Sequence, residues 1–158
     1  GSIRQHSSGR SGKSVADGRA YFDTSAVLPL YRQEALTASA EALMNDWTPA
    51  ISALGEVEVA SAVARWVRLG ELTEDLATRI DQAFVQDLKE GVFERVRVTD
   101  ANYWQAREWL GQRKTSLRSL DAIHLACAAE NGLTLMTADK LFYDAARKLG
   151  HTAMLLDR

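Results

Sequence analysis

Four acidic residues, Asp23, Glu56, Asp121 and Asp139, stand where the sequence pattern predicts strand ends or the first turns of buried helices. If these carboxylates meet at one place, they raise one another's pKa, and divalent cations are needed to keep them all ionised. A site of oxygen donors, with neither thiolates nor a histidine pair, selects Mg²⁺ or Mn²⁺ over zinc. The chemistry that follows most naturally is phosphodiester hydrolysis, in which one metal activates water and a second, if present, stabilises the leaving oxygen.

Asp23 and Asp139 each follow a short apolar segment with the pattern of a buried strand. Asp23 comes directly after residues 20–22 (AYF), and Asp139 stands two residues after 133–137 (LTLMT). Parallel strands open their ligand crevice at their carboxyl ends, so we expect both carboxylates at its rim. Helix N-capping is the alternative role for either residue taken alone, because a helical pattern follows each.

Glu56 lies in the first turn of a predicted helix that begins near Ser52. It shares a face with Val59 and Val63, which marks the buried side of that helix. Glu58 lies about 200° around the helix from Glu56, so we expect Glu58 to be the solvated acid of the two. An ionised Glu on an apolar face costs several kcal/mol unless it meets a cation or strong donors. We therefore expect Glu56 to meet a cation or strong donors and to belong to the site.

Asp121 lies in the first turn of a helix that is apolar nearly all round and begins near Ser119. The helix dipole offers only about 0.3 to 1 kcal/mol to a carboxylate there, which does not offset burial. A structural salt bridge to Arg118 is the alternative to a place in the acidic site. His124, one turn on, is predicted to be a hydrogen-bonded core residue, with metal ligation as the less favoured role.

Strand patterns alternate with helical patterns along the chain, which predicts a parallel sheet covered by helices on both faces. Predicted strands cover residues 20–22, 49–51, 92–98, 133–137 and 152–156, and predicted helices cover 24–33, 36–47, 53–69, 73–90, 99–111, 119–131 and 138–149. Glycines 70, 91, 111, 132 and 150 stand just after five of the helical patterns, as helix C-termini prefer. The fold class is therefore α/β with a central parallel sheet of five strands.

The composition is that of one compact domain, with 158 residues of which 46% are hydrophobic and 25% charged. The net charge of −2 excludes bulk charge attraction as the main source of binding to nucleic acid or anionic lipid. No run of 18 apolar residues is present, so no membrane span is predicted. A single cysteine, Cys127, excludes an internal disulfide and favours a reducing compartment, so a cytoplasmic location is expected.

Residues 1–18 are rich in Gly, Ser and basic side chains and have almost nothing to bury. We expect a flexible basic tail that is an extension or derives from an expression vector, followed by one folded domain over 19–158. One hypothesis for this arm is that Arg4, Arg10 or Arg19 enters the acidic crevice of the same or a neighbouring molecule.

Four blocks of the sequence resemble the four acidic motifs of the PIN-domain ribonucleases, and most of all the VapC-type toxins of type II toxin–antitoxin pairs. The blocks are YFDTSAVLPLY, SALGEVEVASAVAR, LRSLDAIHLACA and LTLMTADKLFYDAARKLG, in the family's order across residues 20–157. The resemblance implies a three-layer α/β/α sandwich and a metal-dependent endoribonuclease that uses Mg²⁺ or Mn²⁺. It also implies an RNA substrate and a cognate antitoxin as partners.

Carried over by position, the resemblance makes Asp23, Glu56, Asp121 and Asp139 the catalytic and metal-binding acids. It makes Ser25, Thr137 and Asp144 supporting residues: the two hydroxyls hold carboxylates or water, and Asp144 matches an additional acid of some members. For Asp144 a solvated helix position is the alternative.

Arg113, Lys114 and Arg118 cluster just before Asp121 and are candidate RNA-binding residues. Ordinary helix-end charges are the alternative. A homodimer is also expected, because two successive helical patterns offer more apolar surface than a small domain needs, with core packing as the alternative. The residues concerned are Trp66, Val67, Leu69, Leu72, Leu76, Ile80 and Phe84.

Four other functions are weighed against this one. A phosphatase with a nucleophilic Asp needs a second Asp two residues after the first, where this chain has Ser25, and a receiver domain needs an acidic pair that is missing near the first strand. A non-catalytic PIN-like interaction module is expected to have lost one of the four acids, and none is lost. A PIN nuclease with a housekeeping role in RNA processing stays open.

Overall fold

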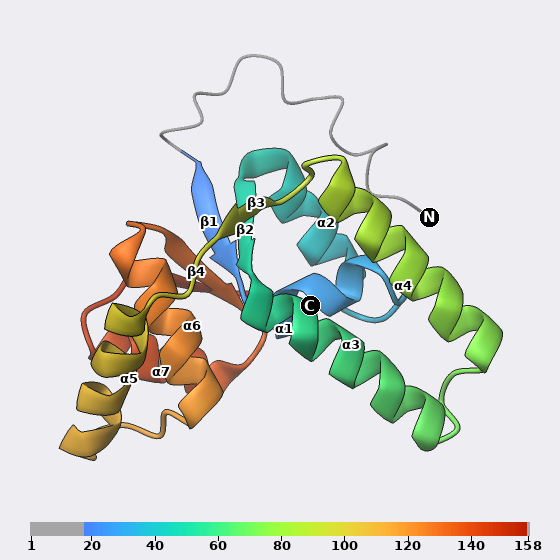
Figure 1. Ribbon diagram of the computed structural model, residues 1–158. Coiled ribbons are helices and arrows are strands. Elements are labelled where there is room, and N and C mark those ends of the chain that lie inside the picture. The colour runs from blue at the N-terminus through green and yellow to red at the C-terminus, as the bar shows by residue number, and fades with distance from the viewer. Residues whose placement is uncertain (1–17, 158) are drawn as a thin grey trace.

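The computed structural model describes residues 18–157, which form a five-stranded, fully parallel sheet flanked by helices (Figure 1). The strand order is β3-β2-β1-β4-β5. The strands are β1 (Arg19–Phe22), β2 (Thr48–Ser52), β3 (Glu94–Val96), β4 (Thr134–Thr137) and β5 (Ala153–Leu155).

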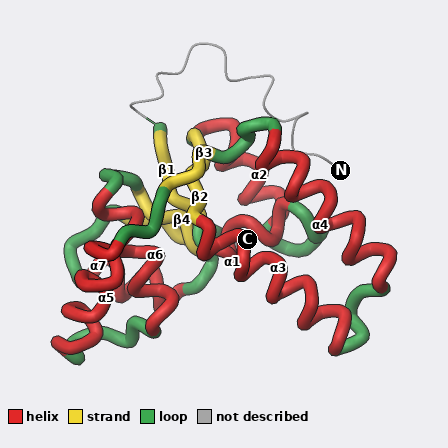
Figure 2. Tube along the Cα trace, viewed as in Figure 1, coloured by secondary structure: helices red, strands yellow, loops and turns green. Residues whose placement is uncertain are grey.

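The helices divide into two groups that cover opposite faces of the sheet (Figure 2). The first group is α1 (Thr24–Val27), the 3₁₀ helix η3 (Leu28–Leu30), α2 (Thr37–Asp46), α3 (Ala53–Arg68) and α4 (Glu74–Lys89); the second is α5 (Asp100–Gln112), α6 (Ser119–Glu130) and α7 (Lys140–Lys148). The three-layer α/β/α sandwich predicted from the sequence is thereby confirmed.

The strands supply side chains to two separate cores because successive residues of a strand point to opposite faces. Tyr21 and Leu135 pack with α5, α6 and α7, whereas Phe22 and Met136 pack with the helices on the other face. All four are at most 1% exposed. Burial on both faces explains why these strands are short apolar runs without a polar alternation.

The chain leaves β1 toward β2 on one side, while β4 pairs with the opposite side of β1, so the winding reverses between β1 and β4. Their register pairs Phe22 with Met136, which brings the ends of both strands to the same level. A crevice opens at the carboxyl ends of strands at such a reversal point. Asp23 and Thr137 therefore stand beside each other at this edge.

Three local expectations are corrected. The helix predicted over 24–33 is a single turn of α-helix followed by η3, because Pro29, in the first turn of η3, has no N–H to donate. The strand predicted over 92–98 is reduced to Glu94–Val96 at the sheet edge. Gly111 lies inside α5, and Arg113 instead takes the left-handed conformation (φ 54°) that caps this helix.

Among the described residues, no helix combines the length and hydropathy that crossing a bilayer requires. The predicted tail at 1–18 lies outside the described residues except for Gly18.

Candidate active site

Asp23 is a buried carboxylate at the end of β1, only 5% exposed. It is the N-cap of α1, where its Oδ1 accepts from the Ala26 N–H at 3.1 Å. Ser25 Oγ donates to Oδ1 and Thr137 Oγ1 donates to Oδ2, both at 2.6 Å. Burial raises the pKa of Asp23 to about 6, against the opposing effect of these hydrogen bonds.

The hydroxyls of Ser25 and Thr137 also fix the turn that follows β4. Ser25 Oγ accepts from the Ala138 N–H at 2.8 Å, and Thr137 Oγ1 accepts from the Asp139 N–H at 3.1 Å. The same two side chains thus hold Asp23 and the backbone that carries Asp139. This is the supporting arrangement expected for Ser25 and Thr137 from the sequence.

Asp121 and Asp139 share one guanidinium. Arg118, the N-cap residue of α6, donates from Nε to Asp121 Oδ2 at 3.4 Å and from Nη2 to Asp139 Oδ2 at 3.2 Å. Burial raises the pKa of Asp121, Arg118 opposes this shift, and the charge of Asp139 adds to it. Asp139 also caps α7 by accepting from the Phe142 N–H at 3.2 Å. Asp139 thus caps a helix and also belongs to the acidic cluster, although these two roles were alternatives on the sequence alone.

The fourth acid at the crevice is Glu58, not Glu56. Glu58 Oε1 accepts from Thr24 Oγ1 at 3.0 Å and lies in hydrogen-bond contact with His124 Nε2. Although burial opposes its ionisation, the hydrogen bond and charge of His124, with the bond from Thr24, lower the pKa of Glu58. Glu58 is therefore held in place as a carboxylate.

A buried chain of hydrogen bonds runs behind Glu58 into the core. His124 is 2% exposed, and its Nδ1 lies 2.6 Å from the hydroxyl of Tyr21, which in turn lies 2.7 Å from Ser52 Oγ. Tyr21 and Ser52 are fully buried. His124 is a hydrogen-bonded core residue, as expected, whereas its contact with Glu58 was not predicted.

Glu56 points away from the crevice, and the expectation that it joins the other acids is corrected. Its carboxylate pairs with Arg95 of β3, with Nη2–Oε1 at 2.6 Å and Nε–Oε2 at 3.0 Å. The cation that Glu56 meets is thus Arg95. The reason is the position of the buried face of α3: Gly55, Val59 and Val63 are buried, so Glu56 and Glu58 flank that face on opposite sides. Glu58 lies on the side toward α6, where it contacts His124.

The four acids Asp23, Glu58, Asp121 and Asp139 line one open cavity of about 400 Å³. Its other walls are Thr24, Ser25, Leu28, Ser61, Ala62, Arg65, Arg68, Arg118 and His124. The acids come from β1, α3, α6 and the turn after β4, as the winding reversal between β1 and β4 requires.

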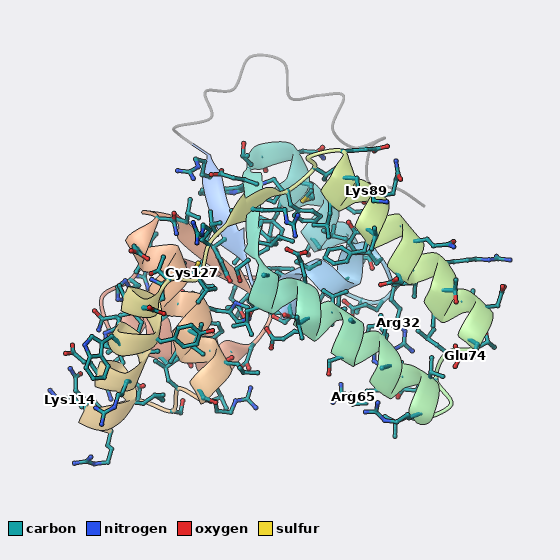
Figure 3. The ribbon with its side chains drawn as sticks, viewed as in Figure 1. Arg32, Arg65, Glu74, Lys89, Lys114 and Cys127 are labelled. Atoms are coloured by element: carbon teal, nitrogen blue, oxygen red, sulfur yellow. The ribbon has the colours of Figure 1, made fainter. Side chains whose placement is uncertain are left out.

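Three other predicted residues lie outside the cavity. Asp144 is exposed and pairs with Lys140 at 3.0 Å. Arg113 donates to the carbonyl of Gly111, and the backbone carbonyl of Lys114 accepts from Lys148 Nζ. Figure 3 shows Lys114 at the outer end of α5, far from Arg65 on α3. Of the three predicted RNA-binding cations, only Arg118 lines the cavity.

Of the three arginines in the hypothesis for the basic arm, the structure describes Arg19, which does not line the cavity. Arg19 lies in β1, where its Nε donates to Glu94 Oε2 at 2.9 Å. Arg4 and Arg10 lie outside the described residues. The guanidinium that does contact the acids is Arg118, from within the fold.

The donor set suits a hard divalent cation. All four acids offer carboxylate oxygens, which Mg²⁺ and Mn²⁺ prefer, and Cys127 is buried in the core on the α5–α7 face of the sheet. Within residues 18–157, no three Asp, Glu, His or Cys side chains are placed to hold a metal ion in this arrangement. Instead, two of the carboxylates already share the positive charge of Arg118, which shows that this pair can face one cation.

Comparison with solved structures finds the same fold in bacterial toxins. VapC20 of Mycobacterium tuberculosis, described as a sarcin–ricin loop cleaving toxin, has 20% identity over 80% of this chain and 94% of its own, with a TM-score of 0.63. VapBC2 of Rickettsia felis, solved bound to a DNA fragment from its promoter, has 16% identity over 88% and 99%, with a TM-score of 0.62. A toxin–antitoxin complex of Klebsiella pneumoniae has 21% identity over 78% and 89%, with a TM-score of 0.58.

A search of curated protein sequences finds no match. The family model described as the PIN domain matches residues 20–148, which include all six acids considered for the site and end just before β5. Fold, strand order and the cavity at the ends of β1 and β4 agree with that match, and this chain belongs to the PIN domain family.

Proposed function

We propose that this protein is a metal-dependent endoribonuclease, the toxin of a toxin–antitoxin pair, which hydrolyses RNA phosphodiester bonds in the crevice at the ends of β1 and β4. The observation that carries the proposal is the gathering of Asp23, Glu58, Asp121 and Asp139 around one cavity in a PIN fold. This set replaces Glu56 of the sequence prediction with Glu58.

Asp23, Asp121 and Asp139 would hold Mg²⁺ or Mn²⁺, with Glu58 beside them. A divalent ion bound there supplies an activated water and stabilises the charge that develops on the phosphate. Ser25 and Thr137 keep the Asp23 carboxylate oriented, and His124 and Thr24 do the same for Glu58. Removing supporting hydrogen bonds of this kind commonly lowers metal affinity 10- to 100-fold.

Arg118 has two tasks in this proposal. Without metal it neutralises part of the charge on Asp121 and Asp139. With metal bound to those carboxylates, the guanidinium becomes available to a phosphate of the RNA, which is the role predicted for it from the sequence.

An antitoxin and a second copy of the chain are the proposed protein partners. Support for the antitoxin comes from structural neighbours that were solved as toxin–antitoxin complexes. Support for a homodimer comes from exposed apolar side chains where α3 ends and α4 begins, with Leu69 65% and Leu76 45% exposed. Phe84, part of the same predicted stripe, is a core residue at 3% exposure.

The proposal is tested by incubating the purified chain with labelled single-stranded and structured RNAs in the presence of a chelator, and then adding excess Mg²⁺ or Mn²⁺. Cleavage is expected only after the metal is added. Cleavage that persists in the chelator would contradict metal dependence, and no cleavage of any RNA with either metal would favour a non-catalytic PIN-like module.

Replacing Arg118 by Ala is expected to raise the affinity for Mn²⁺ about two- to fivefold at low salt, because exposed ion pairs of this kind contribute about 0.2 to 1 kcal/mol. The gain should shrink as salt screens the pairs. Calorimetric titration of Mn²⁺ into the RNA-free protein measures it. Arg113→Ala, outside the cavity, is the control and should leave the affinity unchanged. An Arg118→Ala protein with the parent's affinity would show that the guanidinium does not compete with metal.

A further inference from the structure

We propose that Arg65 and Arg68 on α3 form a phosphate-binding subsite, which holds the RNA backbone beside the scissile phosphodiester. This inference rests on the proposed function and adds to it the residues that bind the flanking nucleotides. Both arginines line the same cavity as the four acids.

The subsite follows from the face that α3 presents to the cavity. Ser61 and Ala62 lie three and four residues after Glu58, Arg65 lies three residues after Ala62, and Arg68 three residues after Arg65, so all five lie along one side of the helix. Arg65 stands about two helical turns from Glu58, and Arg68 about one turn further. They are thus placed to reach phosphates next to the reacting one, rather than the reacting phosphate itself.

The side chains between Glu58 and Arg65 are small. Ser61 and Ala62 line the cavity without filling it, so the surface between the acids and the arginines stays open. An extended RNA backbone that enters at the acids can therefore follow α3 toward Arg65 and Arg68. Figure 3 shows Arg65 projecting from the outer half of α3.

The two guanidinium groups are available for an anion. Arg65 and Arg68 are exposed, and within residues 18–157 neither has an ion pair or a side-chain hydrogen bond. By contrast, Arg19, Arg32, Arg79, Arg95 and Arg118 each pair with a carboxylate.

Such a subsite supplies the positive charge that RNA needs beside an acidic cavity. The acids repel RNA phosphates, and the net charge of the chain is −2, so attraction must be local. Two unpaired arginines on the wall of the acidic cavity supply that attraction where the backbone passes. Guanidinium groups suit this task because they bind phosphate oxygens in pairs and stay charged at any working pH.

The test measures binding of a short single-stranded RNA to the full-length chain carrying Asp139→Asn, in Mg²⁺, as a function of salt. Each phosphate contact contributes about 0.7 to the slope of log affinity against log salt for a single strand. Adding Arg65→Ala and Arg68→Ala should therefore lower the slope by about 1.4 and weaken binding roughly tenfold at 50 mM salt.

Two matched variants make the result specific. Arg79→Ala with Arg147→Ala removes the same charge from exposed positions outside the cavity, and should change the slope little. Arg65→Lys with Arg68→Lys keeps the charges and should retain most of the slope. Equal slopes for the Arg65→Ala, Arg68→Ala protein and its parent, or equal losses in the Arg79, Arg147 control, would overturn the subsite.

The result of this binding test can be distinguished from the result of the cleavage test of the proposed function. If the unmodified chain cleaves RNA while the salt slopes do not differ, the subsite fails and the nuclease stands. If the chain cleaves no RNA but the slope falls only in the Arg65→Ala, Arg68→Ala protein, the subsite stands without the reaction. Failure of the chain to bind RNA at all would overturn the subsite.

Discussion

Replacing Asp23 by Asn is expected to abolish metal-dependent RNA cleavage and, at the same time, to stabilise the metal-free protein at pH 7. Loss of cleavage follows because Asp23 is the most buried of the four acids and a proposed metal ligand. Stabilisation follows because a buried carboxylate without a cation is costly in its ionised form. Asn keeps the N-cap of α1, since Asn and Asp cap equally well.

The pH dependence of this stabilisation has a definite sign. The pKa of Asp23 rises from 3.8 to about 6 on folding, so the folded state binds the proton more tightly than the unfolded state. The parent protein therefore loses stability as pH rises through this window, by about 2 to 3 kcal/mol once the group is fully ionised. Asp23→Asn avoids that loss at pH 7, and its advantage should disappear as pH falls from 6 to below 4.

Denaturant unfolding of both proteins in a chelator measures the expected stabilisation at pH 7 and its expected disappearance at pH 4. The metal-free condition matters because bound cations would stabilise the parent protein alone. An Asp23→Asn protein that unfolds more readily than its parent at pH 7 would show that the Asp23 carboxylate stabilises the fold, and would contradict the expected cost of burying it in its ionised form.

Glu58→Gln is expected to lower the cleavage rate by more than about 100-fold, whereas Glu56→Gln is expected to keep most of it. Removing a residue that only supports a metal ligand commonly lowers metal affinity or activity 10- to 100-fold. Loss of a carboxylate in the cavity itself should lower the cleavage rate at least as much. Glu56 lies 2.6 Å from Arg95 on the other side of α3 and lines a different cavity.

The two variants are matched, because each changes one carboxylate of the same helix to the isosteric amide. Rate constants at saturating metal and RNA, together with thermal unfolding of each protein, separate chemistry from stability. A large loss in Glu56→Gln with little effect in Glu58→Gln would restore the residue expected from the sequence and contradict the orientation of α3 described here.

The sequence was sufficient for the fold class and for three of the four acids in the cavity. Asp23 and Asp139 could be placed because their position depends on where a strand ends, and the apolar runs 20–22 and 133–137 mark those ends clearly. Asp121 could be placed because its helix is apolar on nearly every side, so an acid in its first turn has to face the open end.

Hydropathy placed Glu56 on the apolar face of α3, whereas the buried residues are Gly55, Val59 and Val63, so that Glu56 and Glu58 flank this face on opposite sides. Which of the two acids faces the cavity depends on how α3 lies against α6, where Glu58 contacts His124.

Contacts between residues distant in the sequence could not be predicted either. The hydrogen bond between Tyr21 and His124 joins residues 103 positions apart, and nothing in either segment specifies it. The salt bridge of Arg118 to Asp121 was predicted as an alternative because the two lie three residues apart at a helix start. Its second contact, with Asp139, needed the tertiary structure.

The most direct test of the central claim compares RNA cleavage by the parent chain and by its Asp121→Asn, Asp139→Asn variant, prepared identically and assayed in Mg²⁺ with a labelled RNA. If the acidic cavity is the catalytic site, the parent produces discrete fragments and the variant produces none, although both unfold at similar temperatures. Equal cleavage by the two proteins would contradict the account, because the activity would then arise from another site or from a contaminating nuclease.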